Sequence, residues 1–148
     1  MSVFNHVGQC VTDLERTRAF YVDVLGFELW RELTFPDEGS DRLLRLTPPM
    51  DMTACYLRRD GFVLELLSFA GSGAAPLPYR ERTMNEPGLT HVSVSVDDID
   101  ETCRRAIEYG GQVLDDTNIG AAVFIRDPEG QLVELLPMSY AERMAAEG

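Results

Sequence analysis

The feature that most constrains the fold is an internal repeat. The segment Asp60–Leu67 reads DGFVLELL, and residues 129–136 read EGQLVELL. Each copy is a turn followed by an apolar, strand-like run with one glutamate at its centre, Glu65 in the first and Glu134 in the second. A carboxylate in such a run is costly to bury unless it is paired or bound to a cation. Two carboxylates at matching places therefore indicate one shared task.

The repeat extends to the start of the chain. A second constant offset aligns Val3–Val7 with Gly88–Val92 and places the only two histidines, His6 and His91, opposite each other. A self-match of this kind predicts duplicated structural units. We expect an α+β fold in which two tandem βαβββ modules form a curved mixed sheet around a metal-binding cleft. The expected boundaries are residues 1–69 for the first module, 70–88 for a linker, 89–137 for the second module and 138–148 for a C-terminal tail.

Local patterns give each module the same order of elements. Residues 3–11 alternate as a strand with His6, Gly8 and Cys10 on one face. Asp13 is a typical helix N-cap, and Gly26 supplies a left-handed stop. The second module repeats this order from a strand over residues 89–96, whose alternation puts His91, Ser93 and Ser95 on the face away from the following helix.

Two segments fall outside the repeat. Residues 36–52 have no counterpart in the second module, and they are predicted to form a turn over 36–40 followed by an added hairpin or loop. This insertion is either part of a pocket wall or a surface segment without function. The Gly-, Ala- and Pro-rich composition of residues 70–87 predicts a linker without regular structure.

Composition excludes several partners. The net charge of −12 argues against nucleic acid as a partner and against docking on an anionic membrane. No apolar run is long enough to span a membrane, and the N-terminus lacks the pattern of a secretory signal. The three cysteines are predicted to be buried free thiols, which indicates a reducing compartment and hence a cytoplasmic protein.

The chemistry is predicted to reside in the duplicated histidines and glutamates. If both modules contribute to one sheet, two imidazoles and two carboxylates converge, and this donor set suits a divalent first-row metal with open positions left for water or substrate. Taken singly, a strand histidine or glutamate is more often an ordinary core or surface residue than a metal ligand. The acidic run Asp97–Glu101 is typical of a helix N-terminus. Arg80 and Arg82 either hold a substrate anion or lie in a solvated loop.

The motifs together resemble the vicinal oxygen chelate superfamily. This superfamily includes glyoxalase I, methylmalonyl-CoA epimerase, extradiol dioxygenases and proteins of bleomycin or fosfomycin resistance. The resemblance covers nearly the whole chain except the insertion and the tail. It rests on His6, residues 19–21 and 24–27, Leu64–Leu66, His91–Val94, Asp127–Gly130 and Val133–Leu135.

The resemblance implies a metal site and a reaction. It implies that His6, Glu65, His91 and Glu134 bind one divalent ion, which is Ni, Co, Zn, Mn or Fe. The implied reaction is that of a metal-dependent isomerase or lyase, which moves a proton next to a carbonyl of a small-molecule substrate through a chelated enediolate or enolate. Glu134 is the expected base and Glu65 the second acid/base, although the symmetry of the repeat allows the reverse. A homodimer is also implied, with the site either within one chain or shared between chains.

Two other functions remain open at this stage. The first is an Fe(II) extradiol-type dioxygenase that uses His6, His91 and Glu134. The second is a non-catalytic protein that binds an antibiotic or similar small molecule, in which Tyr56 or Phe124 would contact the ligand. The segment Asp115–Gly120 is acidic where bacterial glyoxalase I has a Lys/Gly-rich segment that helps to hold glutathione, and the chain contains no lysine, so glutathione is disfavoured as a cosubstrate.

Overall fold

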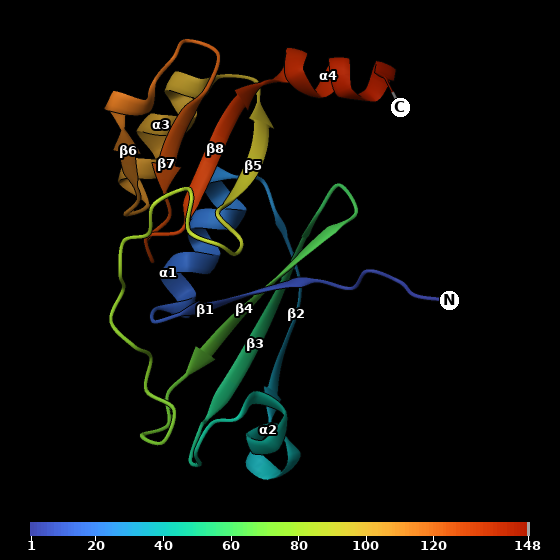
Figure 1. The fold of residues 1–148 in the computed structure, drawn as a ribbon, viewed down its shortest axis with the longest axis vertical. Coiled ribbons are helices and arrows are strands. Elements are labelled where there is room, and N and C mark those ends of the chain that lie inside the picture. The colour runs from blue at the N-terminus through green and yellow to red at the C-terminus, as the bar shows by residue number, and fades with distance from the viewer. Residues whose placement is uncertain (148) are drawn as a thin grey trace. The chain divides into compact units, whose positions relative to one another are not determined.

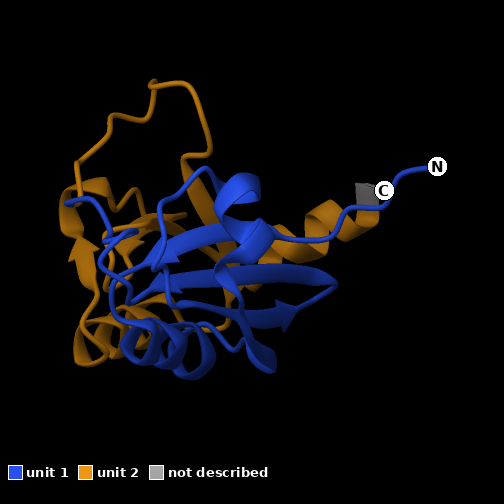
Figure 2. Ribbon diagram, turned by 90° about the horizontal axis from the view of Figure 1, so that it is seen from below, with its two compact units in different colours: residues 1–78 blue, residues 79–148 orange. Residues whose placement is uncertain are grey.

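The chain divides into two compact units, residues 1–78 and residues 79–148 (Figure 2). The computed structural model describes residues 1–147. The division falls at Pro78 and Tyr79, within the segment predicted to be a linker. Within residues 1–147, no helix or strand occurs between Phe69 and His91, a stretch that includes residues 70–87, which were predicted to lack regular structure. No helix of this part of the chain has the length and apolar character needed to cross a membrane.

The first unit is a four-stranded mixed sheet with a helix between its first two strands (Figure 1). Strand order is β1-β4-β3-β2, with β1 parallel to β4 and the other neighbours antiparallel. Helix α1 continues into a short π-helical segment, η1. The elements are β1 Val7–Val11, α1 Leu14–Ala19, η1 Phe20–Val24, β2 Glu28–Phe35, α2 Asp37–Leu44, β3 Met52–Arg59 and β4 Phe62–Phe69.

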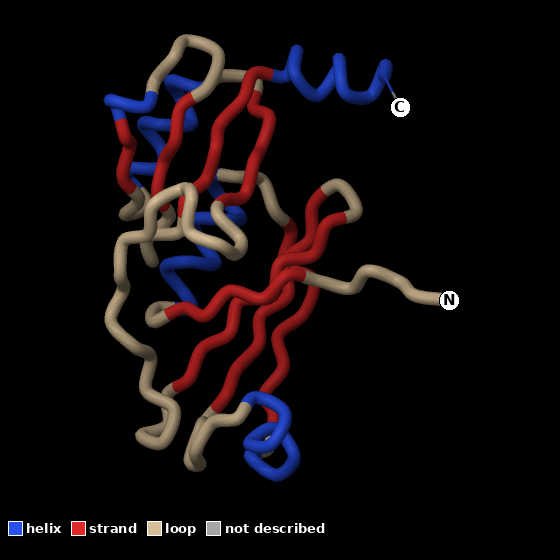
Figure 3. The backbone as a smooth tube through the Cα atoms, in the orientation of Figure 1, coloured by secondary structure: helices blue, strands red, loops and turns tan. Residues whose placement is uncertain are grey.

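The second unit repeats this topology (Figure 3). Its strand order is β5-β8-β7-β6, with β5 parallel to β8. The elements are β5 His91–Val96, α3 Ile99–Glu108, β6 Gln112–Leu114, a 3₁₀ turn η2 Asp115–Thr117, β7 Val123–Arg126, β8 Leu132–Pro137 and α4 Met138–Glu147. The α+β class and the two βαβββ modules are thus confirmed, as two separate four-stranded sheets.

Helices α1 and α3 each pack on one face of their own sheet. The local sequence encodes where these two helices begin and end. The side chain of Asp13 accepts a hydrogen bond from the backbone of Arg16, and Asp98 does the same for Glu101. Gly26 has φ +70° and follows the helix, as predicted. In the first unit, the buried Tyr21 donates a hydrogen bond from its hydroxyl to Gln9 Oε1 at 3.0 Å, which identifies the helix-covered face of β1.

The starts of two strands and the burial of one cysteine differ from expectation. Strand β1 begins at Val7 rather than Val3, and β5 begins at His91 rather than Leu89. Val7 pairs with Leu64 in parallel register, and β4 begins only two residues earlier, at Phe62. The first residues of the chain therefore lie beyond the start of β4, and within residues 1–147 they have no strand beside them to pair with. Cys10 is exposed rather than buried, because it lies on the face of β1 that no helix covers; the buried Cys55 fits the expectation, and burial raises the pKa of its thiol to about 11.

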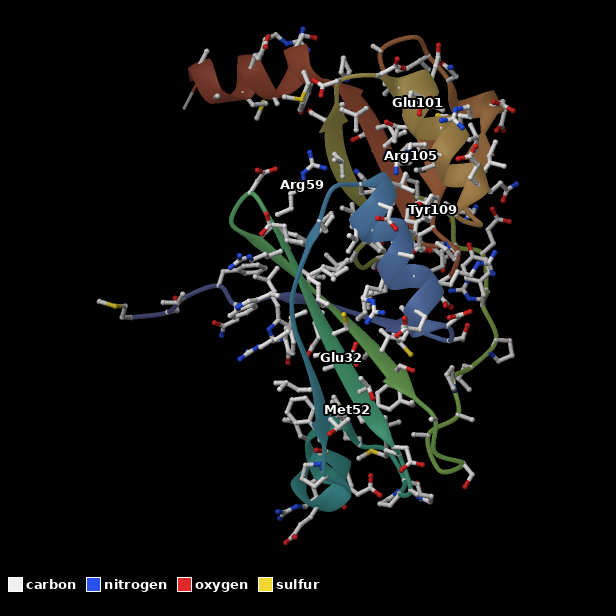
Figure 4. The ribbon with its side chains drawn as sticks, turned by 180° about the vertical axis from the view of Figure 1, so that it is seen from behind. Glu32, Met52, Arg59, Glu101, Arg105 and Tyr109 are labelled. Atoms are coloured by element: carbon white, nitrogen blue, oxygen red, sulfur yellow. The ribbon has the colours of Figure 1, made fainter. Side chains whose placement is uncertain are left out.

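The insertion of residues 36–52 contains a short helix instead of the predicted hairpin or loop. Its first turn is irregular at Glu38 and Gly39, and the side chain of Asp37 accepts a hydrogen bond from the backbone of Met50. Met52, the first residue of β3, lies beside α2 (Figure 4). The insertion packs on the sheet through a cluster that comprises Leu44, Leu46 and Met50 with Met52, Ala54, Tyr56 and Leu67. It therefore covers part of the face that α1 leaves open.

Candidate functional site

In the first unit, strand alternation brings Glu65 to the face away from α1. Its neighbours Leu64 and Leu66 point into the helix-covered core and are fully buried. His6 lies one residue before β1, and its Nε2 is 3.1 Å from Glu65 Oε2. The Glu65 side chain is 10% exposed, so this carboxylate is largely withdrawn from water and depends on its partners.

Tyr56 and Gly8 complete the surroundings of Glu65. Tyr56 is its cross-strand neighbour on β3, and Gly8 is its neighbour on β1. Burial raises the pKa of the Tyr56 hydroxyl to about 12, and a hydrogen bond to Glu65 contributes to the rise. A Cβ at position 8 would lie 3.4 Å from Glu65 Oε2, which is ordinary van der Waals contact. The Tyr56 ring also meets His6 edge-on at 5.8 Å between centroids.

The second unit builds the same arrangement from β5, β7 and β8. His91 Nε2 is 3.7 Å from Glu134 Oε2, and the His91 ring meets Phe124 edge-on at 5.4 Å. Ser93, at the register position of Gly8, donates a hydrogen bond from its hydroxyl to Glu134 Oε2 at 2.7 Å. The Glu134 side chain is 25% exposed. This carboxylate is held by a hydroxyl and is more accessible than Glu65.

The geometry of each pair fits two neighbouring ligands of a metal ion. Bonds of about 2.1 Å to nitrogen and oxygen place donor atoms about 3.0 Å apart at 90° and about 3.4 Å apart at the tetrahedral angle. The His6–Glu65 separation of 3.1 Å falls in this range, and the His91–Glu134 separation of 3.7 Å needs a small side-chain rotation. The structure therefore brings the four predicted ligands together as two pairs, one in each unit. Among residues 1–147, no group of three or more histidine, cysteine or acidic side chains is arranged so that it could hold a metal ion.

A β-bulge in β2 adds a cationic and aromatic group that sequence reasoning missed. Leu29 pairs with Leu57, but the next pair is Arg31 with Tyr56, so Trp30 is an extra residue in the strand. The Arg31 guanidinium carbon lies 4.3 Å from the centroid of the Trp30 ring and 4.8 Å from that of Tyr56. Nothing in the alternation of β2 signals the bulge, because the register of a strand depends on its partner.

A surface cavity of about 590 Å³ borders this group at the tip of the β3–β4 hairpin. Trp30, Arg58 and Val63 line it together with the turn residues Asp60 and Gly61. Arg58 is paired with Glu28 across the strands. The cavity therefore leaves open space next to the Trp30 side chain.

The other candidate residues have structural roles. Arg80 forms an ion pair with Glu86 at 2.8 Å, and Arg82 donates to the backbone carbonyls of Pro87 and Leu89. These two arginines order the segment that precedes β5. The acidic run Asp97–Glu101 contains the N-cap of α3, as predicted.

Comparisons with known proteins identify the family of the chain. The family model described as Glyoxalase/Bleomycin resistance protein/Dioxygenase superfamily matches residues 3–135. A lactoylglutathione lyase of Pseudomonas putida is 32% identical over 145 residues, which is 90% of this chain and 84% of that protein. The mitochondrial methylmalonyl-CoA epimerase of Bos taurus is 30% identical over 138 residues, 88% of this chain and 71% of that protein.

A solved structure has the same fold. The fosfomycin resistance protein FosX from Listeria monocytogenes, complexed with Mn(II) and a sulfate ion, superimposes with a TM-score of 0.62. It is 18% identical and covers 97% of this chain and 98% of its own. At that identity the likeness concerns the fold alone.

Proposed function

Because the chain belongs to the glyoxalase, bleomycin resistance protein and dioxygenase superfamily, we propose that it is a metal-dependent isomerase or lyase that moves a proton next to a carbonyl group of a small molecule. Its relatives include lactoylglutathione lyases and a methylmalonyl-CoA epimerase. In this proposal His6, Glu65, His91 and Glu134 hold one divalent ion, which is Ni, Co, Zn, Mn or Fe.

The observation that supports the proposal most directly is the matched pair of donors. In each unit, one imidazole Nε2 faces one carboxylate oxygen. The pair lies on the face of the sheet opposite to α1 in the first unit and to α3 in the second. Imidazole and carboxylate together suit the first-row divalent ions. A metal site built from two copies of one module accounts for a histidine and a glutamate at the same two places in both units.

The different surroundings of Glu134 and Glu65 suit them to different roles in proton transfer. When bound, a divalent ion supplies Lewis-acid stabilisation of the negative charge that develops on the substrate oxygens. Glu134, which is the more exposed carboxylate, takes the proton from the carbon next to the carbonyl and returns it to the same or the neighbouring carbon. Ser93 donates a hydrogen bond to this carboxylate and so stabilises its ionised form, which is the form that accepts a proton. Glu65, which Tyr56 and His6 hold in place, acts as the second acid/base.

The first experiment measures metal content by elemental analysis after purification without tags or chelators. We expect about one divalent ion per set of four ligands, lost in His6→Ala and in Glu134→Ala. Glu101→Ala is the matched control, because it removes an exposed carboxylate from α3 and should retain the metal. A native protein that neither retains nor rebinds a divalent ion would overturn the proposal.

The second experiment tests the reaction class. Metal-loaded protein in D₂O is incubated with lactoylglutathione or methylmalonyl-CoA, and NMR follows the loss of the proton next to the carbonyl. We expect exchange with at least one compound, and a strong reduction in Glu134→Gln. Retention of metal without any exchange in either compound would argue for a different substrate or for a binding protein.

We also propose a homodimer, and a mixing experiment tests how the ligands are shared. His6→Ala and His91→Ala lack different ligands. If the four ligands come from two chains, an equal mixture of the variants regains about a quarter of the metal sites after subunit exchange. If they come from one chain, the mixture regains none.

A further inference from the structure

We infer that Arg31, held against Trp30 and Tyr56, is the subsite for an anionic group of the substrate, a carboxylate or a phosphonate, beside the His6–Glu65 pair. The inference rests on the proposed function, because it describes the substrate of the same site. It adds that this substrate carries a negative charge at a distance from the oxygens that contact the metal.

The first support is the register of the first sheet. Arg31 pairs with Tyr56 and Tyr56 pairs with Glu65, so one row of side chains crosses the sheet from the arginine to the carboxylate. Adjacent strands are about 4.8 Å apart, which places the backbone of Arg31 about 10 Å from that of Glu65. A small molecule whose anionic group lies a few bonds from its two chelating oxygens can reach both.

The second support is the availability of the Arg31 charge. Three other arginines of the unit form ion pairs: Arg18 pairs with Glu15 and Glu32, Arg58 with Glu28, and Arg59 with Asp60. Within residues 1–147, no ion pair involves Arg31, whose contacts are the two aromatic rings. A guanidinium placed over ring faces keeps its in-plane N–H groups for a bidentate bond to an oxyanion.

The third support is a difference between the units. In the second sheet, Leu114 pairs with Phe124 and Phe124 with Glu134, so a leucine occupies the place of Arg31. Strand β6 has no bulge in its pairing with β7. The duplicated donors would by themselves accept a substrate in two opposite orientations, and a single cation on one side selects one of them. The orientation of the substrate matters because the two glutamates have different surroundings.

The test uses the only tryptophan of the chain as its reporter. Trp30 contacts the Arg31 guanidinium, so an anion that binds Arg31 should change the Trp30 fluorescence. Chelator-treated protein is titrated with glutarate, with methylphosphonate and with neutral dimethyl glutarate at constant ionic strength. We expect saturable changes with one or both anions and none with the neutral ester; the anion that binds more tightly tells a carboxylate subsite from a phosphonate subsite.

Three variants assign the effect to Arg31. Arg31→Gln should weaken anion binding at least about tenfold, the scale of one lost charge-assisted hydrogen-bonding pair. Arg31→Lys should recover part of it, since lysine keeps the charge and loses the planar fork. Arg143→Gln is the matched control, because it removes one positive charge that also lies over an aromatic ring, at 5.8 Å from Tyr140 on α4, and it should titrate as the unmodified protein does.

The outcomes separate this inference from the proposed function. A saturable change that survives in Arg31→Gln, or no saturable change with either anion, overturns the anionic subsite. Neither result bears on metal content, which the elemental analysis measures independently. If the elemental analysis shows that the untreated protein neither retains nor rebinds a divalent ion, anion binding at Arg31 would keep the subsite and remove the proposed reaction.

Discussion

The two units can be compared along the row of side chains that crosses each sheet at its central glutamate. From one edge strand to the other, the row reads Arg31, Tyr56, Glu65 and Gly8 in the first unit, and Leu114, Phe124, Glu134 and Ser93 in the second. The glutamate is the same in both rows, while every neighbour differs. The repeat has thus kept the donor atoms and changed what supports them.

The two glutamates differ in exposure and in their hydrogen-bond partners. Glu65 is nearly buried beside a tyrosine and a glycine, whereas Glu134 is more exposed and accepts its hydrogen bond from a serine. A carboxylate enclosed by packed neighbours moves less than one at the surface, and a more mobile carboxylate is the better candidate to carry a proton. The comparison therefore supports a fixed role for Glu65 and a moving role for Glu134.

The largest expected effect tests this division directly. Glu134→Gln should lower the rate of proton exchange by about 10²- to 10⁴-fold, the usual contribution of a positioned general base. Glu65→Gln should lower it less, because an amide oxygen keeps one donor in the same packed place. Both variants are measured by exchange in D₂O at matched metal occupancy. A larger loss in Glu65→Gln would reverse the two roles.

The cores next to the two glutamates should be equally sensitive. Leu66 and Leu135 are fully buried and follow Glu65 and Glu134 in sequence. Leu66→Ala and Leu135→Ala should each reduce the free energy of unfolding by about 2–5 kcal/mol, through lost burial and the cavity that remains. Urea unfolding measures both. A cost below about 1 kcal/mol for one of them would mean that its unit contributes little to the stability of the chain.

The hydrogen bonds to the two carboxylates should affect metal binding more modestly. Tyr56→Phe removes the hydroxyl next to Glu65, and Ser93→Ala removes the one next to Glu134. Each should weaken metal affinity by roughly tenfold, as expected for partners that orient a ligand. Competition with a fluorescent chelator measures the affinity. Unchanged affinity in both variants would show that packing alone orients the glutamates.

The smallest effect concerns the two helix caps, where the units do not differ. Asp13→Ala and Asp98→Ala each remove a side-chain acceptor at the start of a helix, with hydrogen bonds of 3.1 and 2.9 Å in the native chain. Each should lower the free energy of unfolding by about 1 kcal/mol. Thermal unfolding is the measurement. Unequal costs would indicate that one helix depends less on its cap than on its packing.

Much of this organisation could be predicted from the sequence because the signals are local and occur twice. The caps Asp13 and Asp98 define where each long helix starts, and strand alternation separates Glu65 from its buried neighbours. The pairing of His6 with Glu65 and of His91 with Glu134 was not among these predictions, because it depends on the register between β1 and β4 and between β5 and β8. The order of elements was therefore predictable even though the ends of β1 and β5 were not.

The sequence by itself determined the two repeated modules, the faces of their strands and the residue types on each face, since these depend on chain neighbours. The tertiary structure alone decided which side chains meet across strands, because that depends on register, and a single extra residue such as Trp30 shifts it. For this reason the support of Glu134 by Ser93, the position of Arg31 over Tyr56 and the packing of residues 36–52 as a helix became visible only in the folded chain.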